Sequence, residues 1–76
     1  MSLGVTHMKN KIREYREQLN LTQIEFAKLI EVSRQTVISL ESGKYNPSLP
    51  LAYKISKIFN KTIEEVFVFE EDENEI

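Results

Sequence analysis

Apolar residues recur every three or four positions between residues 12 and 67. This spacing is typical of helices that bury one face, and strict alternation, the mark of a half-buried strand, is absent from it. Five successive stretches show the pattern, so we expect five helices whose apolar faces share one core. The predicted core positions, in chain order, are Ile12, Tyr15 and Leu19; Phe26, Ala27 and Ile30; Val37 and Leu40; Leu51, Ala52, Ile55, Ile58 and Phe59; and Ile63, Val66 and Phe67.

Polar residues mark where these helices begin and end. The first helix is expected over residues 9–19, with Asn20 ending it, and the fourth helix is expected to end near Phe59. A Ser or Thr at a helix start can accept a backbone N–H of the first turn, and a Glu three residues later completes a capping box. The predicted caps of the second to fifth helices are Thr22 (with Glu25), Ser33, Ser48 and Thr62 (with Glu65).

The stretch of residues 23–40 contains two short helices joined by a two-residue turn, Glu31-Val32. Ala27 is small and allows the two helices to cross closely. Gly43 follows the second helix, where a left-handed residue often ends a helix. Two helices with such a turn form a helix-turn-helix, whose second helix fits the major groove of DNA.

Over residues 12–67 the chain resembles the Cro/cI-type (Xre) family of helix-turn-helix proteins. The resemblance implies an all-α, compact five-helix, lambda-repressor-like domain. The family usually has Gly in the turn where this chain has Glu31; if the turn requires a positive φ, Glu31 is strained by about 1 kcal/mol. The matching residues are Leu21-Thr22-Gln23, Glu25-Phe26-Ala27, Val32-Ser33-Arg34-Gln35-Thr36, Leu40-Glu41-Ser42-Gly43-Lys44 and Asn46-Pro47-Ser48.

An apolar run continues past the last predicted helix, over residues 66–69. It is either a frayed helix end or a short C-terminal strand, and residues 3–5 could pair with it as a small ribbon. Apolar residues exposed at the end of a small domain indicate a protein contact. The predicted dimer interface is therefore Val66, Phe67, Val68 and Phe69.

The net charge of −2 conceals two unlike parts. Residues 70–76 include five acids, and the rest of the chain has ten Lys and Arg against seven acids, or +3. We interpret residues 70–76 as a disordered acidic tail, serving solubility alone or else repelling non-specific DNA or contacting a partner. Residues 1–8, where Met8 is an alternative start, are interpreted as a flexible extension or vector remnant, and residues 9–69 as the domain.

The exposed side of the predicted recognition helix, opposite Val37 and Leu40, contains the candidates for base contacts. An Arg can bond two acceptors of guanine, a Gln can pair with adenine, and an aliphatic side chain can meet a thymine methyl group. Ile38 could alternatively belong to the edge of the core. The candidates are Arg34, Gln35, Ile38 and Ser39. The family resemblance supports Arg34, Gln35 and Ser39.

Other residues are expected to contact the DNA backbone, which positions a protein without reading sequence. Gln23 begins the second helix, where unpaired N–H groups attract phosphate. Thr36 either touches a phosphate or packs, and the ring of Tyr45 could instead lie over the fourth helix. Lys44 and Asn46 complete the set. Solvation is the expected role of Lys9, Lys11, Arg13, Lys28, Lys54, Lys57 and Lys61.

Arg16 and Glu41 lie near the buried sides of the first and third predicted helices. The family resemblance implies that they form a buried ion pair that fixes the orientation of these helices. We therefore assign both residues a structural role and no DNA contact.

The sequence predicts a cytoplasmic, sequence-specific regulator that binds double-stranded DNA, acts as a repressor and pairs as a homodimer on a palindromic operator. An antitoxin-type or other protein-interaction module is the alternative, although residues 70–76 offer only Ile76 as an apolar anchor. An enzyme is not expected: cysteine is absent, and no paired histidine, metal-ligand cluster or phosphate-binding Gly loop is found. We expect no cofactor, no small-molecule ligand and no membrane segment.

Overall fold

The computed structural model describes residues 9–68. The predictions for residues 1–8 and 69–76, including the ribbon partner, Phe69 and the acidic tail, lie outside the described residues. The five expected helices are present in this part of the chain. They are α1 (Ile12–Gln18), α2 (Gln23–Ile30), α3 (Arg34–Glu41), α4 (Leu49–Phe59) and α5 (Ile63–Val66).

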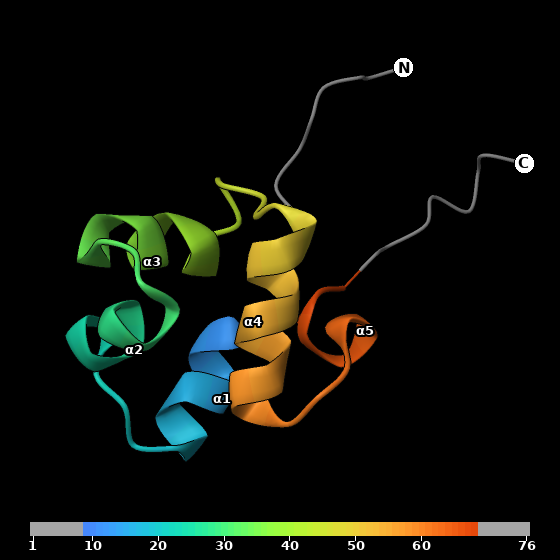
Figure 1. The fold of residues 1–76 in the computed structure, drawn as a ribbon, viewed down its shortest axis with the longest axis horizontal. Coiled ribbons are helices and arrows are strands. Elements are labelled where there is room, and N and C mark those ends of the chain that lie inside the picture. Colours follow the sequence, from blue (N-terminus) through green and yellow to red (C-terminus); the bar gives the residue numbers. More distant parts are fainter. Residues whose placement is uncertain (1–8, 69–76) are drawn as a thin grey trace, which may run out of the picture.

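The helices surround one apolar core. In Figure 1, α2 and α3 lie on one side of α4, and α5 lies on the other. The Phe26 ring of α2 stacks on the Phe59 ring of α4 with 5.3 Å between centroids, and the Tyr15 ring of α1 meets the same Phe59 ring at 5.5 Å. Three helices thus meet at Phe59, and the predicted all-α architecture is confirmed.

The predicted caps determine where four of the helices start. Thr22 and Thr62 form reciprocal capping boxes with Glu25 and Glu65, each Glu side chain accepting the N–H of its Thr at 2.8 Å. The Ser33 hydroxyl accepts the N–H of Thr36 at 3.1 Å, and Ser48 caps α4 in the same way. Each cap satisfies a backbone donor that a helix start would otherwise leave unpaired.

The turn between α2 and α3 requires a left-handed residue at Glu31, where the family usually has glycine. Glu31 has φ 62° and ψ 46°, a region that costs a residue with a side chain about 1 kcal/mol. After the turn, Val32 donates its N–H to the carbonyl of Ala27 at 3.0 Å, so the close connection is kept despite this strain.

Helix α3 ends at a left-handed glycine, Gly43, as the sequence predicted. Gly43 has φ 80°, and its N–H bonds to the carbonyl of Leu40 while the next N–H, of Lys44, reaches the carbonyl of Ser39. This pair of bonds is the Schellman motif, which needs a left-handed residue at the Gly43 position.

The first helix is shorter than predicted. The helix begins at Ile12, after Asn10, whose Oδ1 accepts the N–H of Ile12 at 3.0 Å and whose Nδ2 donates to the carbonyl of Leu40 at 2.8 Å. Leu19, predicted to face the core, follows the helix end and is 48% exposed. The prediction that Leu19 lies in the core is wrong, and Arg16 is the buried residue on that face.

The C-terminal apolar run differs from both predicted forms. Phe67 is extended, Lys11 donates its N–H to the carbonyl of Val66, and Val68 donates to the carbonyl of Lys9. These bonds make an isolated antiparallel bridge and no strand within residues 9–68. The bridge buries Val66 and Phe67 in the core, so they are not exposed on the single chain as a dimer surface would require.

Candidate nucleic-acid interface

Helix α3 presents its polar side to the outside. Val37 and Leu40 are fully buried, which fixes the rotation of the helix about its axis. Arg34 and Gln35 are exposed, and three further residues of the helix are half-buried: Thr36, Ile38 and Ser39. All four candidates for base contacts therefore retain accessible surface on α3.

Two hollows flank this exposed side. The larger, of about 560 Å³, is lined by Arg13, Arg16, Thr22, Gln23, Ile24, Arg34 and Glu41. It lies at the N-terminus of α2, and its lining includes the exposed Arg13 and Arg34, whereas Arg16 is paired with Glu41. Since helix N-termini and guanidinium groups both attract phosphate, this hollow suits a segment of DNA backbone.

The smaller hollow, of about 260 Å³, lies along α3 and the loop after it. It contains four of the predicted contact residues and the cap of α3: Ser33, Gln35, Thr36, Ser39 and Tyr45. The Thr36 hydroxyl lies 3.0 Å from the Ser33 hydroxyl, and Tyr45 is 43% exposed. The tyrosine ring therefore borders α3 with an accessible surface.

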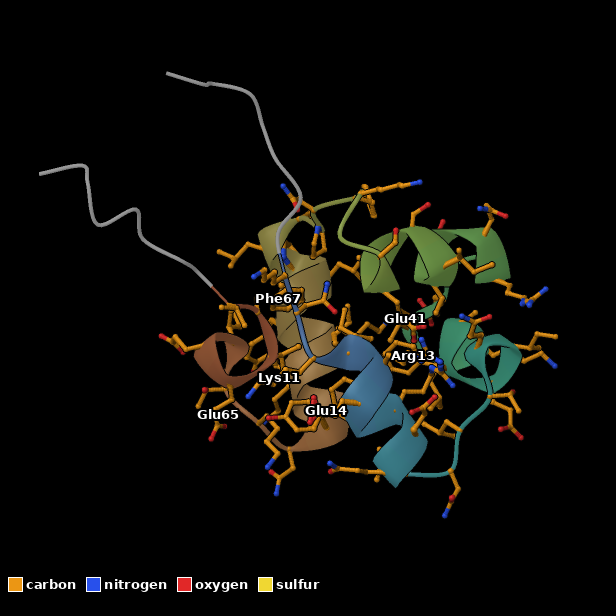
Figure 2. All side chains as sticks on the ribbon, turned by 180° about the vertical axis from the view of Figure 1, so that it is seen from behind. Lys11, Arg13, Glu14, Glu41, Glu65 and Phe67 are labelled. Carbon is orange, nitrogen blue, oxygen red and sulfur yellow. The ribbon has the colours of Figure 1, made fainter. Side chains whose placement is uncertain are left out.

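A buried ion pair lies beneath the larger hollow. Arg16 of α1 donates from Nε to Glu41 Oε2 at 2.5 Å and from Nη2 to Glu41 Oε1 at 3.3 Å. The side chains are only 9% and 7% exposed. Arg16 Nη1 also donates to the carbonyl of Leu21 at 2.8 Å, so α1 is joined both to α3 and to the segment that precedes α2. Figure 2 shows Glu41 at this junction, with Arg13 nearby.

Gln23 connects this ion pair to the recognition helix. Its Nε2 donates to Glu41 Oε1 at 3.1 Å, and its Oε1 accepts from Arg34 Nε at 3.2 Å. A continuous polar chain therefore runs from buried Arg16 through Glu41 and Gln23 to exposed Arg34. The Gln23 side chain, which is predicted to clamp a phosphate, is thus held through both the nitrogen and the oxygen of its amide.

The remaining predicted residues are distributed around the two hollows. Lys44 and Asn46 are exposed in the loop that follows α3, outside the linings of both hollows. Ile38 also lies outside both linings and is half-buried, which fits either of its two interpretations.

Sequence reasoning missed Arg13. It was assigned to solvation, yet it lines the larger hollow, where its Nε also donates to Glu17 Oε2 at 3.2 Å. The signal was available: Arg13 precedes Arg16 by three residues and so shares a helix face with it.

Two other kinds of site are not found among residues 9–68. This part of the chain holds no group of three or more His, Asp or Glu side chains that could bind a metal ion. None of its helices has the length and apolar character needed to cross a membrane.

Comparisons with known proteins place this geometry in a family. A family model described as helix-turn-helix matches residues 12–66. The chain is 56% identical to an uncharacterized helix-turn-helix transcriptional regulator of Methanocaldococcus jannaschii, over 87% of this chain and 100% of the relative. A second such regulator, from Archaeoglobus fulgidus, is 53% identical over 87% of this chain and 93% of the relative.

Solved structures show the same fold. An SOS-response transcriptional repressor, LexA, from Eubacterium rectale superposes with a TM-score of 0.69 at 26% identity, covering 87% of this chain and 68% of that one. The clp gene regulator ClgR of Corynebacterium glutamicum gives 0.65 at 22% identity, covering 71% and 57%. The curated relatives are regulators and not enzymes, and this chain is a DNA-binding transcriptional regulator of the Cro/cI-type (Xre) helix-turn-helix family.

Proposed function

We propose that this regulator is cytoplasmic, binds a palindromic operator as a homodimer, reads its sequence through α3 and represses transcription. The observation that carries the proposal is the accessible polar side of α3 between two hollows, with Arg34 at its start. Repression is the simplest outcome, because a bound dimer prevents other proteins from using the DNA that it covers.

Base recognition is assigned to Arg34, Gln35, Ile38 and Ser39. Arg34 and Gln35 can each make two hydrogen bonds to one base, guanine and adenine respectively, each worth about 1–3 kcal/mol of discrimination. Ile38 supplies apolar contact to a thymine methyl group, and Ser39 donates or accepts without strong preference. The exposure of Arg34 and Gln35 and the partial exposure of Ile38 and Ser39 support the assignment.

Backbone contacts are assigned to both sides of α3. Gln23 and Arg13 would meet one strand at the larger hollow, and Thr36 and Tyr45 the other at the smaller one. Lys44 and Asn46, exposed in the adjoining loop, extend the second contact. These residues would set the register and orientation of α3 without reading bases.

A homodimer is proposed because one recognition helix spans only half of an operator, and two-fold pairing places two helices roughly 34 Å apart in successive major grooves. Since Val66 and Phe67 are buried, the proposed pairing surface moves to the exposed side of α4, where Leu49 is 71% and Tyr53 58% exposed. Val68 and Phe69, predicted from the sequence, remain further candidates.

The hollow beside this side of α4 contains charges of both signs, which supports two-fold pairing. It measures about 510 Å³ and its lining includes Tyr53, Lys57, Lys61 and Glu64. A two-fold interface brings the same surface together twice, so it must be complementary to itself. Lysines and a glutamate in one hollow meet that requirement.

The test of sequence reading is selection from a randomised duplex pool by the full chain, repeated at two salt concentrations. We expect one palindromic sequence to be enriched, with affinity falling as salt rises because phosphate contacts release counterions. Binding without any enriched sequence would contradict the proposal.

The test of pairing is sedimentation at micromolar concentration. The double variant Leu49→Glu, Tyr53→Glu should shift the protein toward monomer, since it places four buried charges in a two-fold interface. The matched control is Leu29→Glu on α2, where the wild-type side chain is 48% exposed. Equal dimer fractions in wild type and the double variant would remove this surface.

A further inference from the structure

We propose that Glu41 is a positioning residue for base recognition, which acts through Gln23 to orient Arg34. The inference rests on the proposed function, because it requires that Arg34 reads a base. It gives Glu41, whose first role is structural, a second role. Its basis is the unbroken chain of hydrogen bonds from Arg16 to Arg34.

The neighbours of Gln23 determine which way its amide points. An ionised carboxylate only accepts hydrogen bonds and a guanidinium only donates them. The Gln23 amide must therefore turn its NH₂ group to Glu41 and its oxygen to Arg34, as it does at 3.1 Å and 3.2 Å. The reverse orientation would set oxygen against carboxylate and nitrogen against guanidinium.

This requirement explains why a glutamine stands at position 23. Glutamate at this position has no hydrogen to donate to Glu41, and lysine has no lone pair to accept from Arg34. Only a side chain with both an acceptor and a donor at its end can join a buried carboxylate to an exposed guanidinium.

Glu41 is itself a fixed reference point. Its oxygens accept from Arg16 Nε, Arg16 Nη2 and Gln23 Nε2, and its side chain is only 7% exposed. Among residues 9–68, every buried side-chain nitrogen or oxygen has a hydrogen-bond partner. The position of the carboxylate is thus set by the core, and Gln23 transmits it to the surface.

The consequence for Arg34 is a preferred direction. Its Nε donates to Gln23, which leaves the two Nη groups available as a donor pair. This is the pair that guanine O6 and N7 accept. Holding Arg34 in advance reduces the freedom that it must lose on binding DNA.

The decisive variant is Gln23→Met, which keeps the length of the side chain, removes both hydrogen bonds and leaves the Arg16–Glu41 pair in place. Against wild type, we expect discrimination at the base pair read by Arg34 to fall by about tenfold, an ordinary coupling between contacting residues. Discrimination at the other positions should change little. The control Lys44→Ala should weaken binding to all sequences alike.

A double-mutant cycle separates positioning from a direct phosphate contact. In the Arg34→Ala background, Gln23→Met should cause no further loss of discrimination, because the residue through which Gln23 acts is gone. If the two substitutions instead lower discrimination independently, Gln23 does not act through Arg34 and the inference is overturned.

Nuclear magnetic resonance of the protein without DNA tests the link separately from the proposed function. The Arg34 Nε–H signal should report an ordered side chain in wild type and a mobile one both in Gln23→Met and in the folded double variant Arg16→Met, Glu41→Leu. An equally ordered Arg34 in all three proteins would overturn the inference. A wild-type protein that orders Arg34 yet selects no sequence would contradict the proposed function instead.

Discussion

Two junctions of this small domain are held together by different forces. Where α1, α2 and α3 meet, the central contacts are charged and directional, with Arg16 and Glu41 buried against each other. Where α4 packs on α2 and α5, the contacts are apolar: Ile55 and Val66 have no exposed surface, and Phe59 stacks on Phe26.

The difference follows from what each junction must hold. Apolar burial is strong but non-directional, so it fills a core without fixing the angle of a polar side chain at the surface. A charged pair satisfied by several hydrogen bonds has one good geometry. The polar junction lies directly beneath the recognition helix, where orientation matters, and the apolar junction contributes mainly stability.

The largest expected effect comes from breaking the polar junction on one side. Arg16→Met leaves Glu41 buried without its partner and should cost about 3–5 kcal/mol in the free energy of unfolding, measured by urea denaturation. The matched control, Arg16→Met with Glu41→Leu, removes both charges and should recover most of that loss. A double variant as unstable as the single one would show that the pair itself supplies the stability.

Breaking the apolar junction should cost stability and leave recognition alone. Ile55→Ala should lower the free energy of unfolding by about 2–5 kcal/mol through the cavity that it leaves, and Ile55→Val by about 0.5–1.5 kcal/mol. In selection from the same duplex pool, Ile55→Val should enrich the same DNA sequence as the wild-type protein. A changed sequence preference would contradict the division between the two junctions.

The turn at Glu31 joins α2 to the recognition helix and can be relaxed without touching either junction. Glu31→Gly should raise the free energy of unfolding by about 1 kcal/mol, because glycine adopts φ 62° without steric cost. The loss of the Lys54–Glu31 ion pair at 3.2 Å should subtract little from this gain, since both side chains are well exposed. Thermal unfolding measures the outcome, and a lowered melting temperature would argue against strain in the turn.

The smallest effect is expected from acid at α5, in the apolar half. The backbone N–H of Thr62 lowers the pKa of Glu65, so this carboxylate stabilises the fold above its unfolded pKa, and the contribution is lost as the pH falls through the lowered folded pKa. Stability measured from neutral to acidic pH should therefore fall less in Glu65→Gln than in wild type. Parallel profiles would show that the capping box contributes nothing through its charge.

Much of the fold could be predicted because its signals are local. The caps at Thr22, Ser33 and Thr62 act within three residues. The left-handed positions at Glu31 and Gly43 lie at the ends of α2 and α3, where such residues are common. The apolar periodicity of α4 was equally local. Such features depend on neighbours in the chain, which a sequence displays directly.

The features that were missed depend on contacts between distant residues. Asn10 bonds the carbonyl of Leu40, thirty positions away, and residues 9–11 pair with Val66 to Val68 at the other end of the domain. The link from Glu41 through Gln23 to Arg34 joins side chains eighteen and eleven residues apart. Periodicity identifies the residues on each face, but it does not show which side chains from different helices meet.

The most direct test of the account is selection from one randomised duplex pool by wild type and by Arg34→Ala, side by side. We predict that wild type enriches a palindrome and that the variant retains it except at one base pair in each half, where preference for guanine is lost. Identical enriched sequences from both proteins would contradict the claim that α3 reads DNA through Arg34.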